Sequence, residues 1–422
     1  MPSESHAPLI NTEAVPPVAG TREVKRAWPS ARVSSADRWL LRTLLRAMGD
    51  PAIRVVLWSG ESMCTADAEP VAALKVKDRQ TLLRLAYQPE LEFGEAYTDG
   101  QLQVDGDLVS VIETVFRAPV NPWAERLLRR SRRPRANTLN GSRDNIHRHY
   151  DLGNDFYRLW LDERMVYTCA YFPTPTASLE DAQVAKMELV CRKLGLRPGE
   201  RVIEAGCGWG ALALHMARQH GVSVRAFNIS HEQIAYAREQ AHKEGLSNRV
   251  EFVEDDYRNV SGQYDAFVSV GMLEHVGADH YRELGGVIDR CLPAHGRGFI
   301  HTIGRNRPLS LNAWVEKHIF PGAYPPTLRE MMAILEPYGF SVLDVENLRL
   351  HYATTLRHWL LRFEHAADRV AAMFDDRFVR AWRLYLAGSV ASFATGSLQL
   401  FQVSFARPQD NAISWTRAHL YQ

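Results

Sequence analysis

The sequence predicts an α/β fold, in which a doubly wound, mostly parallel sheet follows a small α+β domain. Short apolar strands are predicted at residues 201–205, 222–228, 249–253, 264–270 and 298–303. Helical patterns such as 231–243 lie between these strands. Strands that alternate with helices favour a parallel sheet whose two faces are covered by helices. A glycine-rich turn follows the first strand, at the edge where such sheets bind ligands.

The N-terminal part has a different character. Residues 1–20 are rich in Pro, Ser, Glu and Ala and contain no apolar core of the signal-peptide type. We therefore expect residues 1–35 to be a disordered leader and the protein not to be secreted. Residues 36–118 combine a helical pattern at 36–48 with a strand-like run at 53–58, followed by further helical patterns. This segment is predicted to be a small α+β domain.

Arginine is concentrated in the linker predicted at residues 119–148. Residues 126–135 read RLLRRSRRPR, with six arginines and no acid. Such a run is either a solvated tether or a segment attracted to anionic lipid head groups, where each basic side chain contributes about 1 kcal/mol. Nucleic-acid binding is disfavoured because no interleaved aromatic residues accompany the charges. We expect the domain at 36–118, with this linker, to dock on an anionic membrane surface.

Composition excludes several classes of protein. Fifty Lys and Arg against 49 Asp and Glu leave a net charge of +1, so no global excess points to nucleic acid. The five cysteines form no C-x-x-C pair and no H-E-x-x-H occurs, so the sequence suggests neither a disulfide framework nor a common zinc site. A reducing cytoplasm fits best.

One uncharged stretch, at residues 384–406, is long enough to raise the question of a membrane span. It contains several Ser, Gln and Thr residues and two glycines. This composition predicts a buried helix followed by a strand instead.

The glycine-rich turn reads VIEAGCGWG over residues 202–210. Glycines let a ligand lie against the backbone where a strand becomes a helix. A nicotinamide dinucleotide would need G-x-G-x-x-G and an acid about 20 residues later, whereas the next strand ends in Phe227-Asn228-Ile229-Ser230. Glu204 suits a ligand that carries an amino group and a sulfonium; the other interpretation is a surface carboxylate at the end of a strand.

Glu204 and the three glycines that follow it resemble motif I of class I methyltransferases that use S-adenosylmethionine. Longer strings narrow this resemblance: HYDLGNDFY at 149–157, YTCAYF at 167–172, GMLEHVG at 271–277 and HTIG at 301–304. Together they resemble the cyclopropane-fatty-acyl-phospholipid synthase family, which includes the mycolic acid cyclopropane synthases.

The resemblance covers residues 149–406 and implies a methyltransferase catalytic domain at 149–422. The implied architecture is a Rossmann-like sheet, parallel with an antiparallel last strand, and a helical insertion. The string GEAY at 94–97 looks like the small N-terminal domain of full-length bacterial members. The implied partners are a membrane phospholipid with an unsaturated acyl chain and a second copy of the protein in a homodimer. The implied location is cytoplasmic, peripheral on the inner face of the membrane.

Carried over position by position, the resemblance implies a set of S-adenosylmethionine contacts and no metal. Asn228 stands where Thr is more usual, and Thr168 where Ser is usual; both are polar replacements. Asp256 also follows the third strand, where such folds commonly meet the adenosine. The implied contacts are Tyr167, Thr168, Glu204, Gly206, Cys207, Gly208, Gly210, Asn228, Ser230, Gln233, Asp256, Tyr257 and Arg258.

The family also holds a bicarbonate ion beside the reacting carbons. Its implied ligands here are Cys169, Glu274, His301, Tyr352 and the backbone at Ile303. An alkene that attacks the sulfonium methyl develops positive charge and must then lose a proton, so a positioned base is useful. Each residue alone has an ordinary interpretation: a buried thiol, a helix-cap carboxylate, a core histidine and a half-buried aromatic ring.

Ser389 stands where the family often has a Cys that was long proposed to be catalytic. The product is therefore open between a cyclopropane and a methylene- or methyl-branched acyl group. A small-molecule N-methyltransferase and a non-catalytic lipid-binding protein are the further alternatives. The helical segment 354–393, rich in Leu, Phe and Trp, is predicted either to line a tunnel for the acyl group or to pack as ordinary core.

Overall fold

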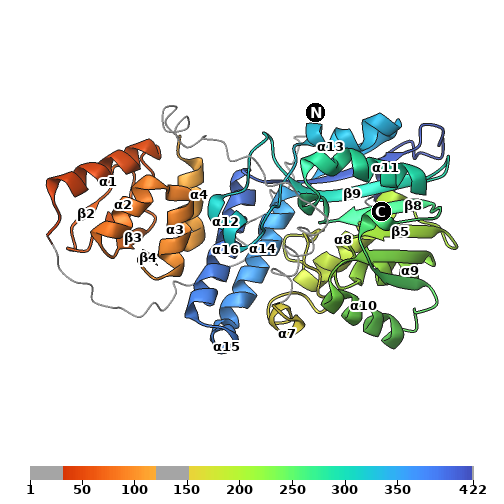
Figure 1. Ribbon diagram of the computed structural model, residues 1–422, viewed down its shortest axis with the longest axis horizontal. Helices are drawn as coiled ribbons and strands as arrows, with labels where there is room; N and C mark the ends of the chain where they lie inside the picture. Colours follow the sequence, from red (N-terminus) through yellow and green to blue (C-terminus); the bar gives the residue numbers. More distant parts are fainter. Residues whose placement is uncertain (1–31, 120–151, 421–422) are drawn as a thin grey trace, which may run out of the picture.

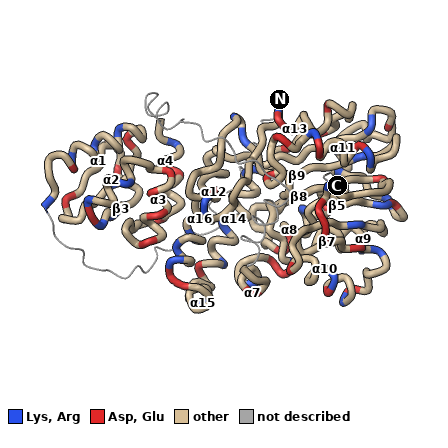
Figure 2. The backbone as a smooth tube through the Cα atoms, in the orientation of Figure 1, with Lys and Arg blue, Asp and Glu red and all other residues tan. Residues whose placement is uncertain are grey.

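The computed structural model describes residues 32–119 and 152–420 (Figure 1). Nearly all of the expected leader and of the arginine-rich linker lies outside the described residues. The described part of the protein has a small N-terminal unit at one end and a large sheet with its helices at the other. Acidic and basic residues are interspersed over both parts (Figure 2).

The N-terminal part is an α+β unit, as expected for residues 36–118. Its four-stranded sheet has the order β2-β1-β3-β4. The strands are β1 (Arg54–Val56), β2 (Ser62–Met63), β3 (Ala73–Val76) and β4 (Leu102–Asp105). The helices are α1 (Ser35–Ala47), α2 (Arg79–Tyr87), α3 (Pro89–Thr98) and α4 (Leu108–Arg117). Side chains of Ser34, Asp78 and Asp107 accept backbone N–H bonds and begin three of these helices.

The large sheet has seven strands in the order β10-β11-β9-β8-β5-β6-β7. β11 runs antiparallel to both of its neighbours, β9 and β10, and the other pairs are parallel. This confirms the predicted parallel sheet with an antiparallel last strand. The strands are β5 (Arg201–Ala205), β6 (Ser223–Asn228), β7 (Val250–Glu254), β8 (Ala266–Val270), β9 (Arg297–Gly304), β10 (Ser341–Asn347) and β11 (Gln399–Ala406).

Helices cover both faces of this sheet because successive strand residues point to opposite faces. In β5, Val202 packs with α8 and α9, whereas Ile203 packs with α11 and α13. The helices that follow α7 (Asn154–Tyr157) are α8 (Leu179–Leu194), α9 (Ala211–His220), α10 (His231–Lys243), α11 (Tyr281–Cys291), α12 (Ala313–His318) and α13 (Leu328–Leu335).

A helical insertion separates β10 from β11, as predicted. It consists of α14 (Arg349–His365), α15 (Ala367–Met373) and α16 (Asp376–Thr395). The stretch 384–406 is the end of α16 followed by β11, which confirms the predicted helix and strand. No helix among the described residues combines the length and apolar character that a membrane crossing requires.

The insertion lies between the N-terminal part and the large sheet (Figure 1). α16 packs along α14 on one side and against α3 and α4 on the other. The GEAY string is in α3, where Glu95 Oε1 accepts hydrogen bonds from Lys317 Nζ at 2.6 Å and from His318 Nε2 at 2.8 Å. A Cβ on Gly94 would lie 2.3 Å from Trp314 Cγ. This string therefore forms part of the contact between the two parts of the protein, together with the packing of α16 on α3 and α4.

Replacing Glu95 by Gln tests this contact. Burial raises the pKa of Glu95, and the hydrogen bonds from His318 and Lys317 outweigh it, so that the pKa lies below its usual value. We expect Glu95→Gln to weaken docking by about 1–3 kcal/mol, since the amide cannot replace two charge-assisted bonds. Amide hydrogen exchange in α3 and α12 would report the loss as faster exchange. Glu92→Gln, which removes a pair with Arg84 inside the N-terminal part, is the control and should leave α12 unchanged.

Candidate active site

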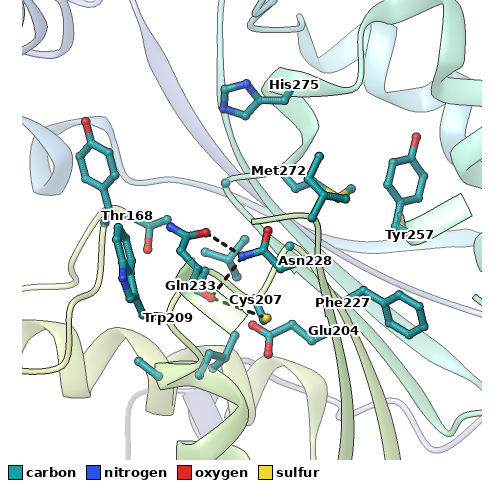
Figure 3. A pocket seen from close by; sticks show the side chains of 18 of the residues that line it. Thr168, Glu204, Cys207, Trp209, Phe227, Asn228, Gln233, Tyr257, Met272 and His275 are labelled. Carbon is teal, nitrogen blue, oxygen red and sulfur yellow. Dashed lines mark hydrogen bonds between the residues drawn. The ribbon is translucent and has the colours of Figure 1, made fainter. Parts of the chain in front are cut away.

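A cavity opens at the carboxyl ends of the parallel strands, where doubly wound sheets bind ligands. Its walls come from the turn after β5, the ends of β6 and β8, the segment after β7 and the segment that precedes α8. Side chains from all of these surround it (Figure 3). The cavity is therefore built from segments more than 100 residues apart in the sequence.

The turn after β5 needs its glycines for two different reasons. Gly206 and Gly208 line the cavity and have φ angles of 85° and 54°, which disfavour side chains. A Cβ on Gly206 would also lie 2.9 Å from Met272 Cβ. Gly210 does not line the cavity; a Cβ there would lie 2.6 Å from Phe252 Cζ, so this glycine allows α9 to approach the sheet.

Glu204 is a buried carboxylate that faces the cavity, so the interpretation as a surface carboxylate is wrong. The residue is 2% exposed, and Oε2 has no hydrogen-bond partner among the described residues. Burial raises the pKa of Glu204 to about 8, although Lys186 opposes the rise. Burial lowers the pKa of Lys186 to about 8, and its Nζ donates to Thr168 Oγ1 at 3.0 Å. An added cationic ligand group would satisfy the unpartnered carboxylate oxygen.

Hydrogen bonds of polar side chains hold the other loops around the cavity in place. Asn228 Nδ2 donates to Gln233 Oε1 at 2.7 Å and to the Gly208 carbonyl at 3.2 Å (Figure 3). Ser230 does not line the cavity; its hydroxyl accepts the Gln233 N–H and begins α10. Asp256 accepts the Arg258 N–H at 2.9 Å and also pairs with its guanidinium. These bonds fix the loops before any ligand arrives.

Apart from Gly210 and Ser230, the residues expected to contact the cofactor all line this cavity. They are Tyr167, Thr168, Glu204, Gly206, Cys207, Gly208, Asn228, Gln233, Asp256, Tyr257 and Arg258. Trp209, inside the turn 203–211 that the resemblance also implied, lines the cavity as well. Further lining residues were not predicted from the sequence, among them Lys186, Phe227, Met272 and His275. His275 directly follows Glu274 in the string GMLEHVG, which carries part of the family resemblance. Burial lowers the pKa of His275 to about 4.

A second group of buried polar atoms lies next to the cavity wall formed by residues 270–272, 275 and 276. Glu274 Oε1 accepts the Ile303 N–H at 2.6 Å, and Oε2 has no hydrogen-bond partner in the described ranges. Burial raises the pKa of Glu274 to about 7. Gln402 Nε2 donates to His301 Nδ1 at 3.1 Å, which places the ring proton on Nε2, an atom without a described partner. Burial also lowers the pKa of His301, so the ring is neutral.

Cys169 and Tyr352 form the other half of the implied ligand set. The Cys169 thiol donates to the Ala170 carbonyl at 3.2 Å and lies 3.9 Å from the Leu348 carbonyl. Tyr352 lies one helical turn beyond Leu348, in α14, and its ring packs against Phe393. No hydrogen bond joins Cys169 to Glu274 or His301 within the parts of the protein that the structure describes. Burial raises the pKa of the Cys169 thiol, which therefore stays protonated.

Comparison with solved structures identifies proteins that have the same fold. The cyclopropane synthase MmaA2 from Mycobacterium tuberculosis superposes with a TM-score of 0.61 at 29% identity, covering 63% of this chain and 98% of that one. A coclaurine N-methyltransferase shares the fold at 21% identity, with a TM-score of 0.59. The sheet order and the cavity at its carboxyl edge define a class I S-adenosylmethionine-dependent methyltransferase.

Sequence comparison then gives the family. The model described as mycolic acid cyclopropane synthetase matches residues 138–403, and the protein belongs to this family. A domain of unknown function matches residues 40–122. A probable fatty acid methyltransferase of Pseudomonas putida is 34% identical over 88% of this chain and 96% of its own length. The cyclopropane-fatty-acyl-phospholipid synthase of Escherichia coli K12 is 36% identical, over 82% of this chain and 91% of its own length.

The carboxylate of Glu204 gives a test of cofactor binding. The ionised carboxylate favours the cationic cofactor, and its pKa of about 8 means that binding at lower pH must first remove a proton. We expect S-adenosylmethionine affinity to rise with pH up to about 8. Glu204→Gln should lower the affinity roughly 10- to 100-fold, the value of a charge-assisted hydrogen bond, and flatten the rise.

Calorimetric titration across this pH range is the measurement. Glu200→Gln is the matched control, because Glu200 precedes the same strand but pairs with Arg297 away from the cavity. An unchanged affinity and slope in Glu204→Gln would remove Glu204 from the cofactor site.

Proposed function

We propose that the protein transfers a methylene group from S-adenosylmethionine to the double bond of an unsaturated phospholipid acyl group and forms a cyclopropane. The observation that carries the proposal is the placement of the unpartnered Glu274 and His301 atoms next to the cofactor cavity. Gly271 lines that cavity and donates its N–H to the His301 carbonyl at 2.9 Å. One segment would thus hold both the cofactor and the groups that bind the base, so that the base can reach the transferred methyl group.

The chemistry explains why two such sites belong together. The alkene electron pair attacks the sulfonium methyl, a carbon–carbon bond forms, and S-adenosylhomocysteine leaves. The adjacent carbon is now cationic, and the new methyl group must lose a proton before the ring can close. A positioned base typically accelerates such a transfer by about 10²- to 10⁴-fold.

We propose bicarbonate as the resident base, held by Cys169, Glu274, His301, Tyr352 and the backbone at Ile303. The donor set fits an anion that can both donate and accept: His301 Nε2 offers a hydrogen, and Glu274 Oε2 is open to accept one. When bound, bicarbonate would supply proton-accepting oxygen atoms in a place where the protein's own groups are neutral or hydrogen-bonded. The Ile303 N–H already donates to Glu274, so this backbone group acts through that carboxylate.

The acyl group is proposed to enter through the helical insertion, within residues 354–393. Tyr167 lines the cavity, and its hydroxyl lies 2.7 Å from that of Tyr385 on α16. Trp359, Phe363 and Phe393 are almost fully buried nearby on α14 and α16. An apolar surround of this kind suits a hydrocarbon, although the same rings also serve as core.

A second candidate function is C-methylation of the acyl group that ends in a methylene or methyl branch. Two observations favour it: Ser389, one helical turn after Tyr385, replaces the Cys often found there, and the Pseudomonas putida relative is described as a fatty acid methyltransferase. A small-molecule N-methyltransferase is a weaker candidate, because an amine can lose its own proton without a dedicated base. The homodimer stays a prediction.

Product analysis separates these functions. Purified protein would be incubated with S-adenosylmethionine and vesicles of a monounsaturated phospholipid, and the fatty acid methyl esters analysed by mass spectrometry with double-bond derivatisation. We expect a gain of one CH₂ with no reactive double bond left, and the same product from Ser389→Cys. The same gain of one CH₂ with a surviving alkene would establish the branched product. Absence of any gain in mass would contradict both lipid functions.

The N-terminal part is proposed to dock on the inner face of the membrane. Trp39 and Tyr87 are 66% and 88% exposed on α1 and α2, and Arg38, Arg42 and Arg46 are exposed along α1. Aromatic side chains beside basic ones suit an anionic lipid surface.

We expect the double variant Trp39→Ser, Tyr87→Ser to bind anionic vesicles at least about 10-fold more weakly, because each ring contributes some 1.5–3 kcal/mol when buried. Vesicle flotation would measure this. Trp415→Ser removes a fully exposed ring in the C-terminal segment and is the control. Equal binding of wild type to neutral and anionic vesicles would exclude an electrostatic contribution to docking.

A further inference from the structure

Two helices bring metal-ligating side chains together outside the active site. Glu188 and Cys191 lie one turn apart on α8, and His215 and His220 lie on α9. One ligand atom from each of Cys191, His215 and His220 can be chosen so that all three lie within 4.8 Å of one another. Glu188 Oε2 lies 3.3 Å from His215 Nε2 and 3.1 Å from His220 Nε2. A thiol and two imidazoles therefore lie close together, and the Glu188 carboxylate contacts both imidazoles.

The spacings are close to those of a tetrahedral zinc site. With Zn–N near 2.0–2.1 Å and Zn–S near 2.3 Å, neighbouring ligand atoms are about 3.3–3.7 Å apart. Both carboxylate–imidazole separations are already near that range. The thiol lies within 4.8 Å of one ring nitrogen of each histidine, so binding would have to draw it closer.

The surroundings also suit a bound cation. Arg192 Nε donates to Glu188 Oε1 at 3.2 Å, which orients the carboxylate and leaves Oε2 directed at the histidines. His220 and Arg164 are the basic groups that act on His215. A carboxylate and a thiolate would together balance the charge of a divalent ion, and the two arginines would stay outside the ligand set. Cys191 is fully buried, whereas Glu188 is 29% exposed and leaves a path for entry.

We propose that Glu188, Cys191, His215 and His220 bind one Zn²⁺ ion. Sulfur, nitrogen and oxygen donors in one set favour zinc over magnesium or calcium. Four protein ligands make a closed, structural site, which ties α8 to α9. α9 follows the glycine turn and α8 carries Lys186, so the ion would hold two walls of the cofactor cavity together.

The competing explanation is a hydrogen-bonded network in which Glu188 Oε2 accepts an N–H from each histidine. That network needs no thiol, whereas the proposed site includes the Cys191 thiolate. Cobalt(II) distinguishes them, because a Co²⁺ ion bound to Cys191 gives a thiolate charge-transfer absorption band that no network produces.

The test uses the full-length protein. Metal content of protein purified without chelator, thermal unfolding with and without Zn²⁺, and absorption after Co²⁺ replacement would be measured for wild type, Cys191→Ala and His220→Ala. We expect one zinc per protein molecule and a raised unfolding temperature with Zn²⁺. Cys191→Ala should lose the charge-transfer band. His220→Ala should lower the zinc affinity by more than about 100-fold. Loss of a residue that only orients a metal ligand typically costs about 10- to 100-fold.

Matched controls are Cys64→Ser, a thiol in the N-terminal part, and His242→Ala, an exposed histidine in the last turn of α10. Both should behave as wild type. His220 ends α9 and is partly exposed, so its variant is expected to fold even if Cys191→Ala does not. Trace metal only, absence of the cobalt band, or equal zinc affinity in wild type and His220→Ala would overturn the proposal.

Discussion

Burial of ionisable groups without full pairing is the constraint on which the site depends. Within the described residues, Glu204 and Glu274 each keep one carboxylate oxygen free of hydrogen bonds in the interior, and His301 keeps Nε2 free. Such atoms cost free energy in the empty protein. The cost is recovered when a ligand supplies the missing charge or hydrogen bond, so the same burial that raises the two carboxyl pKa values prepares the cavity for its ligands.

The fold around these atoms keeps the two sites next to each other. The segment after β8 forms the wall of the cofactor cavity and then places Glu274 behind it. β9, the next strand in the sheet, carries both His301 and the Ile303 amide that holds Glu274. The helical insertion lies beside these groups. The N-terminal part packs on the insertion and contacts α12 through Glu95. A displacement of the N-terminal part would therefore reach the insertion beside the site through α16.

The sequence predicted the sheet well because period-two apolar runs and intervening helical patterns are local signals. Strand 201–205 and helix 231–243 have the predicted bounds. The cavity residues that lie inside the recognised strings were found for the same reason. Lys186 was missed because a single lysine in a helix has no spacing signal, and its burial depends on packing. The Cys191, His215 and His220 cluster was missed because its ligands come from two helices, which no short motif connects.

Dependence of turnover on bicarbonate tests the central claim most directly. Cyclopropane formation would be measured in buffer stripped of carbon dioxide and again after bicarbonate is added, for wild type and Glu274→Gln, with S-adenosylmethionine binding as the control. We predict that wild type loses activity and regains it with bicarbonate. Glu274→Gln should bind the cofactor normally but lose about 10²- to 10⁴-fold in turnover, with no response to bicarbonate. Wild-type turnover independent of bicarbonate, together with an active Glu274→Gln enzyme, would contradict a bicarbonate base at this site.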